Sequence, residues 1–452
     1  GGEWRPALAL LQRMQLQGIS PDLIAFSAAI SACEKGQQWI IALELLSHMQ
    51  EARVQPDVVG CSAVISACEK GGEWECALAV LRSMRARGLQ PNSTSYGAAI
   101  LACASSRQWH VALRLLDRMT ARAVEPDAGS FSRLLSECEQ HGLLDREVAL
   151  LRRLGSGARG LTAAAASAAA IRLVGGSREA DALEVLQEAA AHGHWSAVMM
   201  RLLKALDPDG WRRHAPIAGH GLPGRRGPPP TTHAKELRLL EHVLSSATAG
   251  DASSVCEAIE RFGEEVLGTS TSWLKVAGGA KAKVLTEAVR GTPPGGEVLE
   301  IGAYCGYSAI RMAMVLPSTR IHTLEVDPVH VIIARNVIAY AGLAHLIDVW
   351  TGHSQDLLPR LARRAGAAAP GFRAVFMDQR GSRYEDDLEL LERHGLLRPG
   401  AAVVADNVLK PGAPVFLWRL REDDAYHTEI VSVREFAMPA EDWMSVSTLL
   451  RP

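Results

Sequence analysis

The chain lacks the features by which membrane proteins and thiolate zinc proteins are usually recognised. No apolar run reaches the ~18 residues that a membrane-spanning helix needs. Neither sign of charge dominates, since the formal net charge is −2 and 22% of the residues are charged. We therefore expect no membrane span and an ordinary soluble protein, and the length of 452 residues predicts roughly two or three domains.

The sequence also has no Cys-x-x-Cys pair, which argues against a zinc site built on thiolates. Four of the eight cysteines, Cys33, Cys68, Cys103 and Cys138, lie 35 residues apart, which marks a repeated core position. A reduced intracellular compartment, cytoplasm or organelle, is therefore expected. Because the first residue is Gly and not Met, we expect a targeting peptide to be missing, and the compartment cannot be read from this end.

The spacing of 35 governs the first part of the chain and predicts a helical solenoid. It recurs in the tryptophans Trp4, Trp39, Trp74 and Trp109, the methionines Met14, Met49, Met84 and Met119, and the prolines Pro21, Pro56, Pro91 and Pro126. Within one unit, Pro56-Asp57 opens a first helix, Trp74 to Arg85 forms a second, and Gly88 ends it. Each unit is thus a helix hairpin that buries its apolar faces by stacking on its neighbours.

This array, residues 1–206, resembles pentatricopeptide repeats, whose signature is a 35-residue helix pair that ends in a Pro-Asp step. A degenerate fifth unit is expected at 161–195. The resemblance implies binding of single-stranded RNA, with one base read by a residue of the first helix and the residue after the next Pro. The corresponding pairs are Ser27 with Asp57 and Ser62 with Asn92, whereas Gly97, paired with Asp127, has no side chain to contact a base.

Charge gives the RNA hypothesis no support. Residues 1–206 carry 21 Lys and Arg against 20 Asp and Glu, and binding to a phosphate backbone normally needs a basic surface. A protein-binding or purely structural solenoid is the alternative. The composition then changes at residues 207–232, where Pro, Gly and Arg predict a linker.

The second domain, residues 233–452, alternates helices and strands after three initial helices at 235–249, 253–267 and 280–289. Strands are predicted at 297–301, 321–326, 348–351, 374–377, 401–405, 427–433 and 444–449. This alternation predicts an α/β fold with a doubly wound, mostly parallel seven-stranded sheet. Its ligands are expected at the carboxyl ends of the strands.

Two strand ends predict a nucleoside cofactor. The first strand runs into a Gly-rich turn in the segment EVLEIGAYCGYS at 297–308, where glycines let the backbone pass close to a ligand. Glu325 ends the second strand, 25 residues after Glu300, and an acid there can accept hydrogen bonds from ribose hydroxyls. The alternative is a turn with a purely structural role.

Two further strand ends predict a metal site. Asp378 follows the strand RAVFMD, and Asp406 and Asn407 follow AAVVADN. Oxygen ligands that converge from adjacent strand ends suit octahedral Mg²⁺. A lone Asp after a strand is usually a helix cap or turn residue, but two such ends beside a ribose site favour the metal.

Residues 233–452 resemble catechol O-methyltransferases, with GAYCGYSAIRMA, SQDLLP, ADNV, PGAP and KELRLLEHV as matching blocks. The resemblance implies S-adenosylmethionine and Mg²⁺ as cofactors and a catechol-type acceptor. It implies cofactor contacts from Ala277, Glu300, Gly302, Tyr304, Ser308, Glu325, Ser354 and Asp378. It also implies metal ligands at Asp378, Asp406 and Asn407, and an acceptor site formed by Trp273, Asn407, Pro411 and Glu435. Asp378, Asn407 and Glu435 are the implied catalytic residues.

One departure from the family pattern concerns the general base. The family has a lysine three residues after the first metal Asp, where this chain has Gly381; Gln379 and Arg380 also replace the family's histidine and tryptophan. Lys275, Lys410, His353, metal-bound hydroxide or bulk water are the candidate substitutes. Loss of a positioned base typically costs ~10² to 10⁴-fold in rate.

Two classes of function therefore stay open. The first is a small-molecule O-methyltransferase tethered to a repeat array. The second is an RNA-binding repeat protein whose methyltransferase domain acts on RNA or serves as a binding module.

Overall fold

The computed structural model describes residues 4–122, 124, 128–156, 161–208, 211, 233–267, 274–365, 371–436 and 440–450. Two compact units divide the chain, Gly1–Glu137 and Cys138–Pro452. Most of the predicted linker at 207–232, as well as Trp273 and Asp127, lies outside the described residues. Within the described residues, no helix is both long and apolar enough to cross a membrane.

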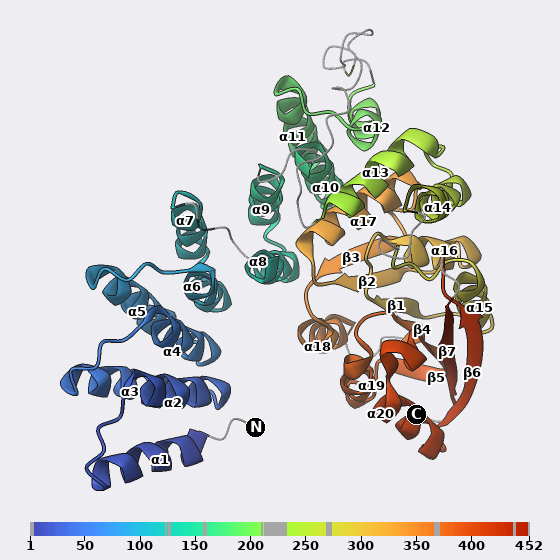
Figure 1. The fold of residues 1–452 in the computed structure, drawn as a ribbon. Coiled ribbons are helices and arrows are strands. Elements are labelled where there is room, and N and C mark those ends of the chain that lie inside the picture. The colour runs from blue at the N-terminus through green and yellow to red at the C-terminus, as the bar shows by residue number, and fades with distance from the viewer. Residues whose placement is uncertain are drawn as a thin grey trace. The chain divides into compact units, whose positions relative to one another are not determined.

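The first unit is a stack of helix pairs (Figure 1). Its helices are α1 (Trp4–Leu16), α2 (Leu23–Lys35), α3 (Trp39–Glu51), α4 (Val58–Lys70), α5 (Trp74–Ala86), α6 (Ser93–Ser105), α7 (Trp109–Thr120) and the start of α8 (Ala128–Gln140). The first helices of successive repeats, α2, α4 and α6, pack on one another. The predicted 35-residue helix-pair array is thereby confirmed.

Local chemistry explains the repeated residues of this array. After Pro21, Pro56 and Pro91, the Asp or Asn caps the next helix, as when Oδ1 of Asp57 accepts from the backbone N of Gly60 at 2.7 Å. The tryptophans that open the second helices lie against the turn of the following repeat, since a Cβ placed on Gly71 would collide with the ring of Trp39. The repeated cysteines, including Cys68, are buried. One period thus supplies a cap, a turn contact and a core residue.

The second unit joins the remaining repeat-like helices to an α/β domain. The repeat-like helices are α9 (Leu144–Ser156), α10 (Leu161–Gly175), α11 (Glu179–Ala191) and α12 (Ala197–Leu206). The α/β domain follows with helices α13 (Ala234–Ser246), α14 (Ala252–Arg261), α15 (Ala280–Arg290), α16 (Tyr307–Val315), α17 (Pro328–Tyr340), α18 (Ser354–Ala365), α19 (Tyr384–Arg393) and α20 (Pro414–Glu422). A π-helical turn, Phe262–Leu267, extends α14.

Seven strands form one sheet in the order β3-β2-β1-β4-β5-β7-β6. They are β1 (Glu297–Ile301), β2 (Ile321–Glu325), β3 (Ile347–Thr351), β4 (Phe372–Met377), β5 (Leu397–Ala405), β6 (Tyr426–Arg434) and β7 (Glu441–Leu449). The first five are parallel, and β7 runs antiparallel to β5 and β6. The predicted α/β class is confirmed, and the strand order reverses beside β1, where such sheets bind ligands.

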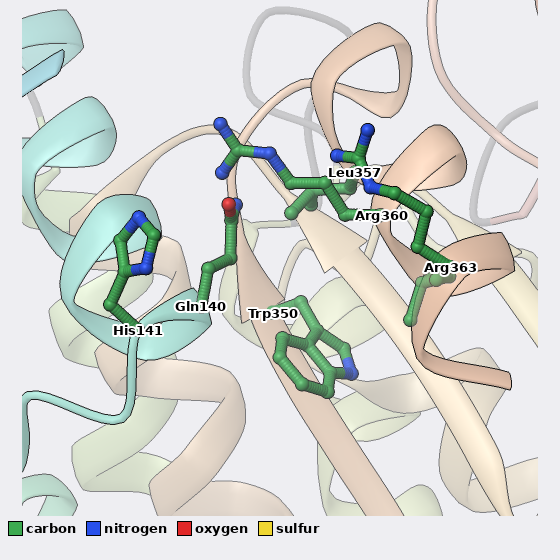
Figure 2. A pocket seen from close by; sticks show the side chains of 7 residues that line it. Gln140, His141, Trp350, Leu357, Arg360 and Arg363 are labelled. Atoms are coloured by element: carbon green, nitrogen blue, oxygen red, sulfur yellow. The ribbon is translucent and has the colours of Figure 1, made fainter.

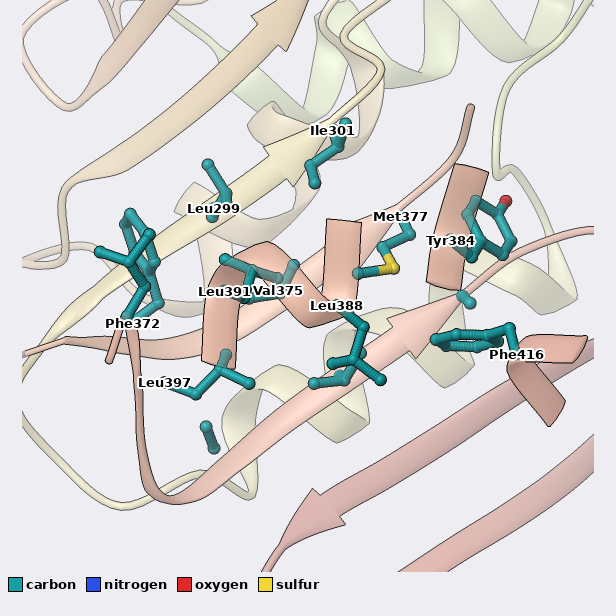
Figure 3. Packing of buried hydrophobic residues seen from close by; sticks show 14 of the residues in the cluster. Leu299, Ile301, Phe372, Val375, Met377, Tyr384, Leu388, Leu391, Leu397 and Phe416 are labelled. Carbon is teal, nitrogen blue, oxygen red and sulfur yellow. The ribbon is translucent and has the colours of Figure 1, made fainter. Parts of the chain in front are cut away.

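An apolar core on one face of the sheet supports the strand ends (Figure 3). Side chains of β1, β4 and β5 meet those of α18, α19 and α20 in this core. The Tyr384 hydroxyl at its border donates to the carbonyl oxygens of Asp406, at 2.8 Å, and Gln379, at 3.2 Å. The core therefore fixes the loops after β4 and β5, the two loops in which the metal ligands were predicted.

Within the second unit, a buried ionic network holds the end of α8 and α9 against α17 and β3, and it includes α10 because Arg172 pairs with Glu147 at 2.7 Å. The Arg335 guanidinium pairs with Glu139 at 2.6 Å and Glu147 at 3.2 Å, and these three residues are at most 7% exposed. Glu139 also accepts from the backbone N of Thr351 in β3 at 2.8 Å. Burial raises the pKa of Glu139, and Arg335 opposes that rise.

Replacing Arg335 with Met should lower the free energy of unfolding by about 3 to 5 kcal/mol, because the buried Glu139 loses its ion-pair partner, whereas Glu147 keeps Arg172 at 2.7 Å. Arg393→Met is the matched control, since the Arg393–Glu389 pair is mostly exposed and such pairs contribute less than about 1 kcal/mol. Guanidinium-induced unfolding of the full chain measures both. Equal effects of the two substitutions would contradict the structural role of the network.

Candidate active site

The turn after β1 brings the backbone close to the strand end of β4. Gly302 has a φ of +107°, and a Cβ there would lie 2.5 Å from the carbonyl oxygen of Asp378. No other residue fits both the conformation and the space. Gly306, with a φ of +85°, then starts α16. The Gly-rich turn therefore packs β1 against β4 and opens the space above their ends.

Glu325 lies where the sequence placed it, across this turn. Its Oε2 accepts from the backbone N of Tyr304 at 2.8 Å, and its Oε1 accepts from the backbone N of Asp327 at 2.9 Å. Two backbone donors therefore hold the carboxylate in one orientation. Each oxygen keeps a second lone pair that could accept a hydroxyl.

Glu300 is fully buried beneath the same turn. It accepts hydrogen bonds from the hydroxyls of Ser308 and Thr323, so its carboxyl group joins β1, β2 and α16. Burial raises the pKa of Glu300 from 4.5 to about 7, against the lowering effect of the two hydroxyls. Ala277 is buried in the segment before α15, and Ser354 opens α18 directly after β3.

A second buried cluster lies at the ends of β4, β5 and β7. The Lys281 ammonium, 1% exposed, contacts Asp406 at 2.9 Å, Glu435 at 2.7 Å and Asp442 at 2.9 Å. Asp378 is electrostatically coupled to these groups, because burial and the charge of Asp406 raise its pKa well above the ordinary value and so favour its neutral form. Three carboxyl groups thus contact one ammonium group, and we call Lys281, Asp378, Asp406, Glu435 and Asp442 the Lys281 cluster.

Lys281 is a fixed cation in this cluster. Burial alone would lower its pKa, but the charges of Asp406 and Glu435 outweigh burial and hold the pKa above its usual value. Burial raises the pKa of Asp406 to about 6, against the effect of Lys281. A lysine held in this way keeps its proton near neutral pH and cannot serve as a general base.

Asn407 completes the predicted metal ligands. Its backbone has a φ of +53°, and its Nδ2 donates to Asp442 at 2.6 Å, so Oδ1 is the atom left to accept or to coordinate. Together, Asp378, Asp406 and Asn407 provide hard oxygen donors beside surplus negative charge. This donor set fits Mg²⁺.

Sequence reasoning missed Lys281 and Asp442. One signal was present, because Lys281 is in phase with the buried Leu285 and Val289 of α15, and a lysine on an apolar helix face needs buried partners. Asp442 gave no such signal. Of the predicted acceptor residues, Glu435 is in the Lys281 cluster, Pro411 belongs to the π-helical turn Val408–Gly412, and Trp273 is outside the described residues.

The loop after β4 has no room for a side chain at Gly381, the position at which the family pattern has its lysine. A Cβ there would lie 2.6 Å from the carbonyl oxygen of Gly412, and Gln379 donates to Asp387 at 2.6 Å. Two of the candidate substitutes for the base, Lys275 and His353, are exposed.

A separate hollow of about 390 Å³ lies in the second unit beyond β3 (Figure 2). It is lined by Gln140, His141, Trp350, Leu357, Arg360, Leu361 and Arg363. None of these is a predicted site residue. The lining combines two arginines with an aromatic ring and contains no carboxylate.

The sheet order, the Gly-rich turn and the acid at the end of β2 define an α/β architecture that is typical of proteins with nucleoside cofactors. Residues 282–442 match a family model described as O-methyltransferase, and residues 2–172 match one described as the pentacotripeptide-repeat region of PRORP. The chain belongs to the O-methyltransferase family and carries a pentatricopeptide-type repeat region at its N-terminus.

Two relatives and one solved structure illustrate the similarity. The chain is 39% identical to catechol O-methyltransferase of Bos taurus over 194 residues, 43% of this chain and 68% of that protein. It is 36% identical to catechol O-methyltransferase B of Danio rerio over 221 residues, 49% of this chain and 81% of that protein. The O-methyltransferase from Bacillus cereus in complex with SAH has 21% identity and a TM-score of 0.36, covering 47% of this chain and 90% of that one.

The raised pKa of Glu300 predicts a pH-dependent stability. The stabilisation from its neutral form is present below pH 4.5, the ordinary pKa, and is lost as pH rises through about 7. The Glu300→Gln side chain stays neutral at every pH. As pH rises between these values, the free energy of unfolding of the variant should therefore increase relative to that of the natural chain, by at most about 1.4 kcal/mol per unit of pKa shift. Denaturant unfolding of both chains at about pH 4.5, 6 and 8 tests this, and parallel pH curves would contradict it.

Proposed function

We propose that residues 233–452 form a Mg²⁺-dependent methyltransferase that transfers the methyl group of S-adenosylmethionine to a catechol-type acceptor. The Lys281 cluster is the observation that carries this proposal. Asp406, Glu435 and Asp442 share one ammonium beside Asp378, so a divalent cation would offset the surplus negative charge. The kinship with catechol O-methyltransferases supports the same activity.

The turn after β1 would hold the cofactor, whose sulfonium supplies an electrophilic methyl group. Glu325 would accept the ribose hydroxyls in its fixed orientation. Gly302, Tyr304 and Ser308 would line the methionine part, since the Gly302 backbone leaves no side chain in the way. The remaining cofactor contacts would come from Ala277, Glu300, Ser354 and Asp378.

Asp378, Asp406 and Asn407 would hold Mg²⁺, which when bound lowers the pKa of a coordinated phenol. The side chain of Glu435, tied to Lys281, would accept a hydrogen bond from the second hydroxyl and orient the ring. Trp273 and Pro411 would flank the acceptor. Because Lys281 keeps its proton and Gly381 has no side chain, the phenolic proton would pass to solvent.

Methyl transfer to dihydroxybenzenes should need Mg²⁺, and its rate should climb with pH into the alkaline range, because the part of the site that the structure describes holds no lysine able to act as a base at neutral pH. Asp406→Asn removes one ligand charge and should lower the rate roughly 100-fold or more. Asp386→Asn, on the exposed face of α19, is the matched control. The readout is transfer of labelled methyl groups, with and without excess chelator.

Equal turnover in excess chelator would contradict the metal's role. If S-adenosylmethionine binds but no acceptor is methylated at any pH, the domain is a binding module. We do not expect Gly381→Lys to restore neutral-pH activity, because the Cβ alone would collide with the backbone of Gly412.

RNA is the second candidate partner, and two observations favour it. The structure brings Ser27 and Asp57 together around Gly60, where a Cβ would lie within 3.3 Å of both side chains. Ser62 and Asn92 meet around Ser95, whose Oγ lies 2.7 Å from Ser62 Oγ and 2.9 Å from Asn92 Oδ1. In the second unit, the hollow beside Trp350 offers arginines for phosphate and a ring for stacking.

The two serines should differ in importance for RNA. Within the described residues, Ser27 Oγ is buried and has no hydrogen-bond partner, so a base that reached it would supply the missing partner, whereas Ser62 Oγ already donates to the carbonyl of Val58 at 2.6 Å. Ser27→Ala should therefore weaken binding of purine-rich single strands by about 0.5 to 1.5 kcal/mol, and Ser62→Ala by less. Fluorescence anisotropy of labelled RNA at several salt concentrations measures this. No binding at low salt would favour the protein-binding or structural solenoid.

A further inference from the structure

Two histidines and one aspartate converge beside the turn that carries Glu325. His233 precedes α13, and Asp327 and His330 occupy the cap and first turn of α17. One potential ligand atom from each of the three residues lies within 4.8 Å of the other two. All three side chains are partly exposed, so an ion could enter from solvent. We call these residues the His233 triad.

Asp327 is oriented for a second partner. Its Oδ1 accepts from the backbone N of Val329 at 2.8 Å, as a helix cap does, and its Oδ2 lies 2.8 Å from Nε2 of His233. The helix cap therefore fixes the carboxylate and directs one oxygen toward the imidazole. The His233 hydrogen bond lowers the pKa of Asp327 against the effect of burial.

His330 is held from two sides. Its ring packs edge to face with Tyr304, with centroids 5.0 Å apart, and with His233, with centroids 5.5 Å apart. Its Nδ1 lies 3.8 Å from Oε1 of Glu325. An outer carboxylate near one imidazole nitrogen is the arrangement that orients metal-binding histidines in proteins.

The donor set selects the kind of ion. Two imidazoles and one carboxylate favour Zn²⁺ and similar transition metals, whereas the all-oxygen set at Asp378, Asp406 and Asn407 suits Mg²⁺. Zinc ligands at about 2.0 to 2.2 Å from the ion lie roughly 3.3 Å apart, so small rotations of the imidazoles would close the triad. Within the described residues, three acids, Glu236, Glu325 and Asp327, lie at or next to the triad, and Lys235 pairs with Glu236 at 3.3 Å.

We propose that the His233 triad binds one Zn²⁺ ion, with water in the remaining position, and that the ion ties the start of α13 to the start of α17. It is a site distinct from the Lys281 cluster, because the two share no residue. The proposal does not depend on methyltransferase activity. An ion that binds only the folded chain raises its stability by mass action.

The test uses the full chain without a polyhistidine tag. Calorimetric titration with Zn²⁺ should find one tight site that His233→Gln and His330→Gln each weaken. The loss of Zn²⁺ affinity in each variant should be larger than roughly 10- to 100-fold, which is the typical effect of removing a residue that only hydrogen-bonds to a metal ligand. His394→Gln, an exposed histidine on the far end of α19, and Asp406→Asn should both leave the affinity unchanged.

Two readouts separate the triad from other zinc sites. The first readout uses Co²⁺ as the probe, and its visible spectrum should show nitrogen and oxygen ligation. The second is the melting temperature, which Zn²⁺ should raise for the natural chain but not for His330→Gln. Both His→Gln variants should melt normally without metal, which shows that they fold. Unchanged Zn²⁺ affinity in both variants, loss of the ion in Asp406→Asn alone, or a thiolate band with Co²⁺ would each overturn the proposal.

Discussion

The interaction on which the candidate active site depends is the burial of the Lys281 ammonium among carboxylates. Lys281 comes from α15, Asp406 follows β5, Glu435 lies between β6 and β7, and Asp442 is in β7. One cation therefore fastens four chain segments at the edge of the sheet. Removal of a buried cation from such a set typically costs more than the pair contributes, so the position of Lys281 constrains every neighbouring ligand.

Buried polar contacts also join the last repeat-like helices to the sheet. In the described part of the sheet, β3 is an edge strand, and an edge strand needs its backbone groups covered. Glu139 accepts from the backbone N of Thr351, and the small side chains of α10 let α17 approach so closely that Asn336 donates to the carbonyl of Ala164 at 2.9 Å. The alanine-rich run of α10 is thus a packing surface.

The sequence predicted elements well where periodicity is strong. The 35-residue repeat and the apolar strands β1 to β5 left few alternatives, and β5 differs mainly at its start, Leu397, because Pro399 and Gly400 look like a turn. Lys281 and the His233 triad escaped prediction for a different reason. Their partners lie about 94 to 161 residues away, and a contact between such segments depends on helix and strand packing that local pattern does not encode.

The backbone around Gly381 leaves no space for the lysine that the family pattern has at this position. The loop after β4 lies so close to Gly412 that no Cβ fits at Gly381. Two hydrogen bonds hold that loop: the Gln379 side chain donates to Asp387, and the Tyr384 hydroxyl donates to the carbonyl of Gln379. The backbone at Gly381 is therefore well anchored, and a lysine side chain at this position would oppose those contacts. In the proposed methyltransferase, cofactor position and the charge of the Lys281 cluster are contributions that would act without a base.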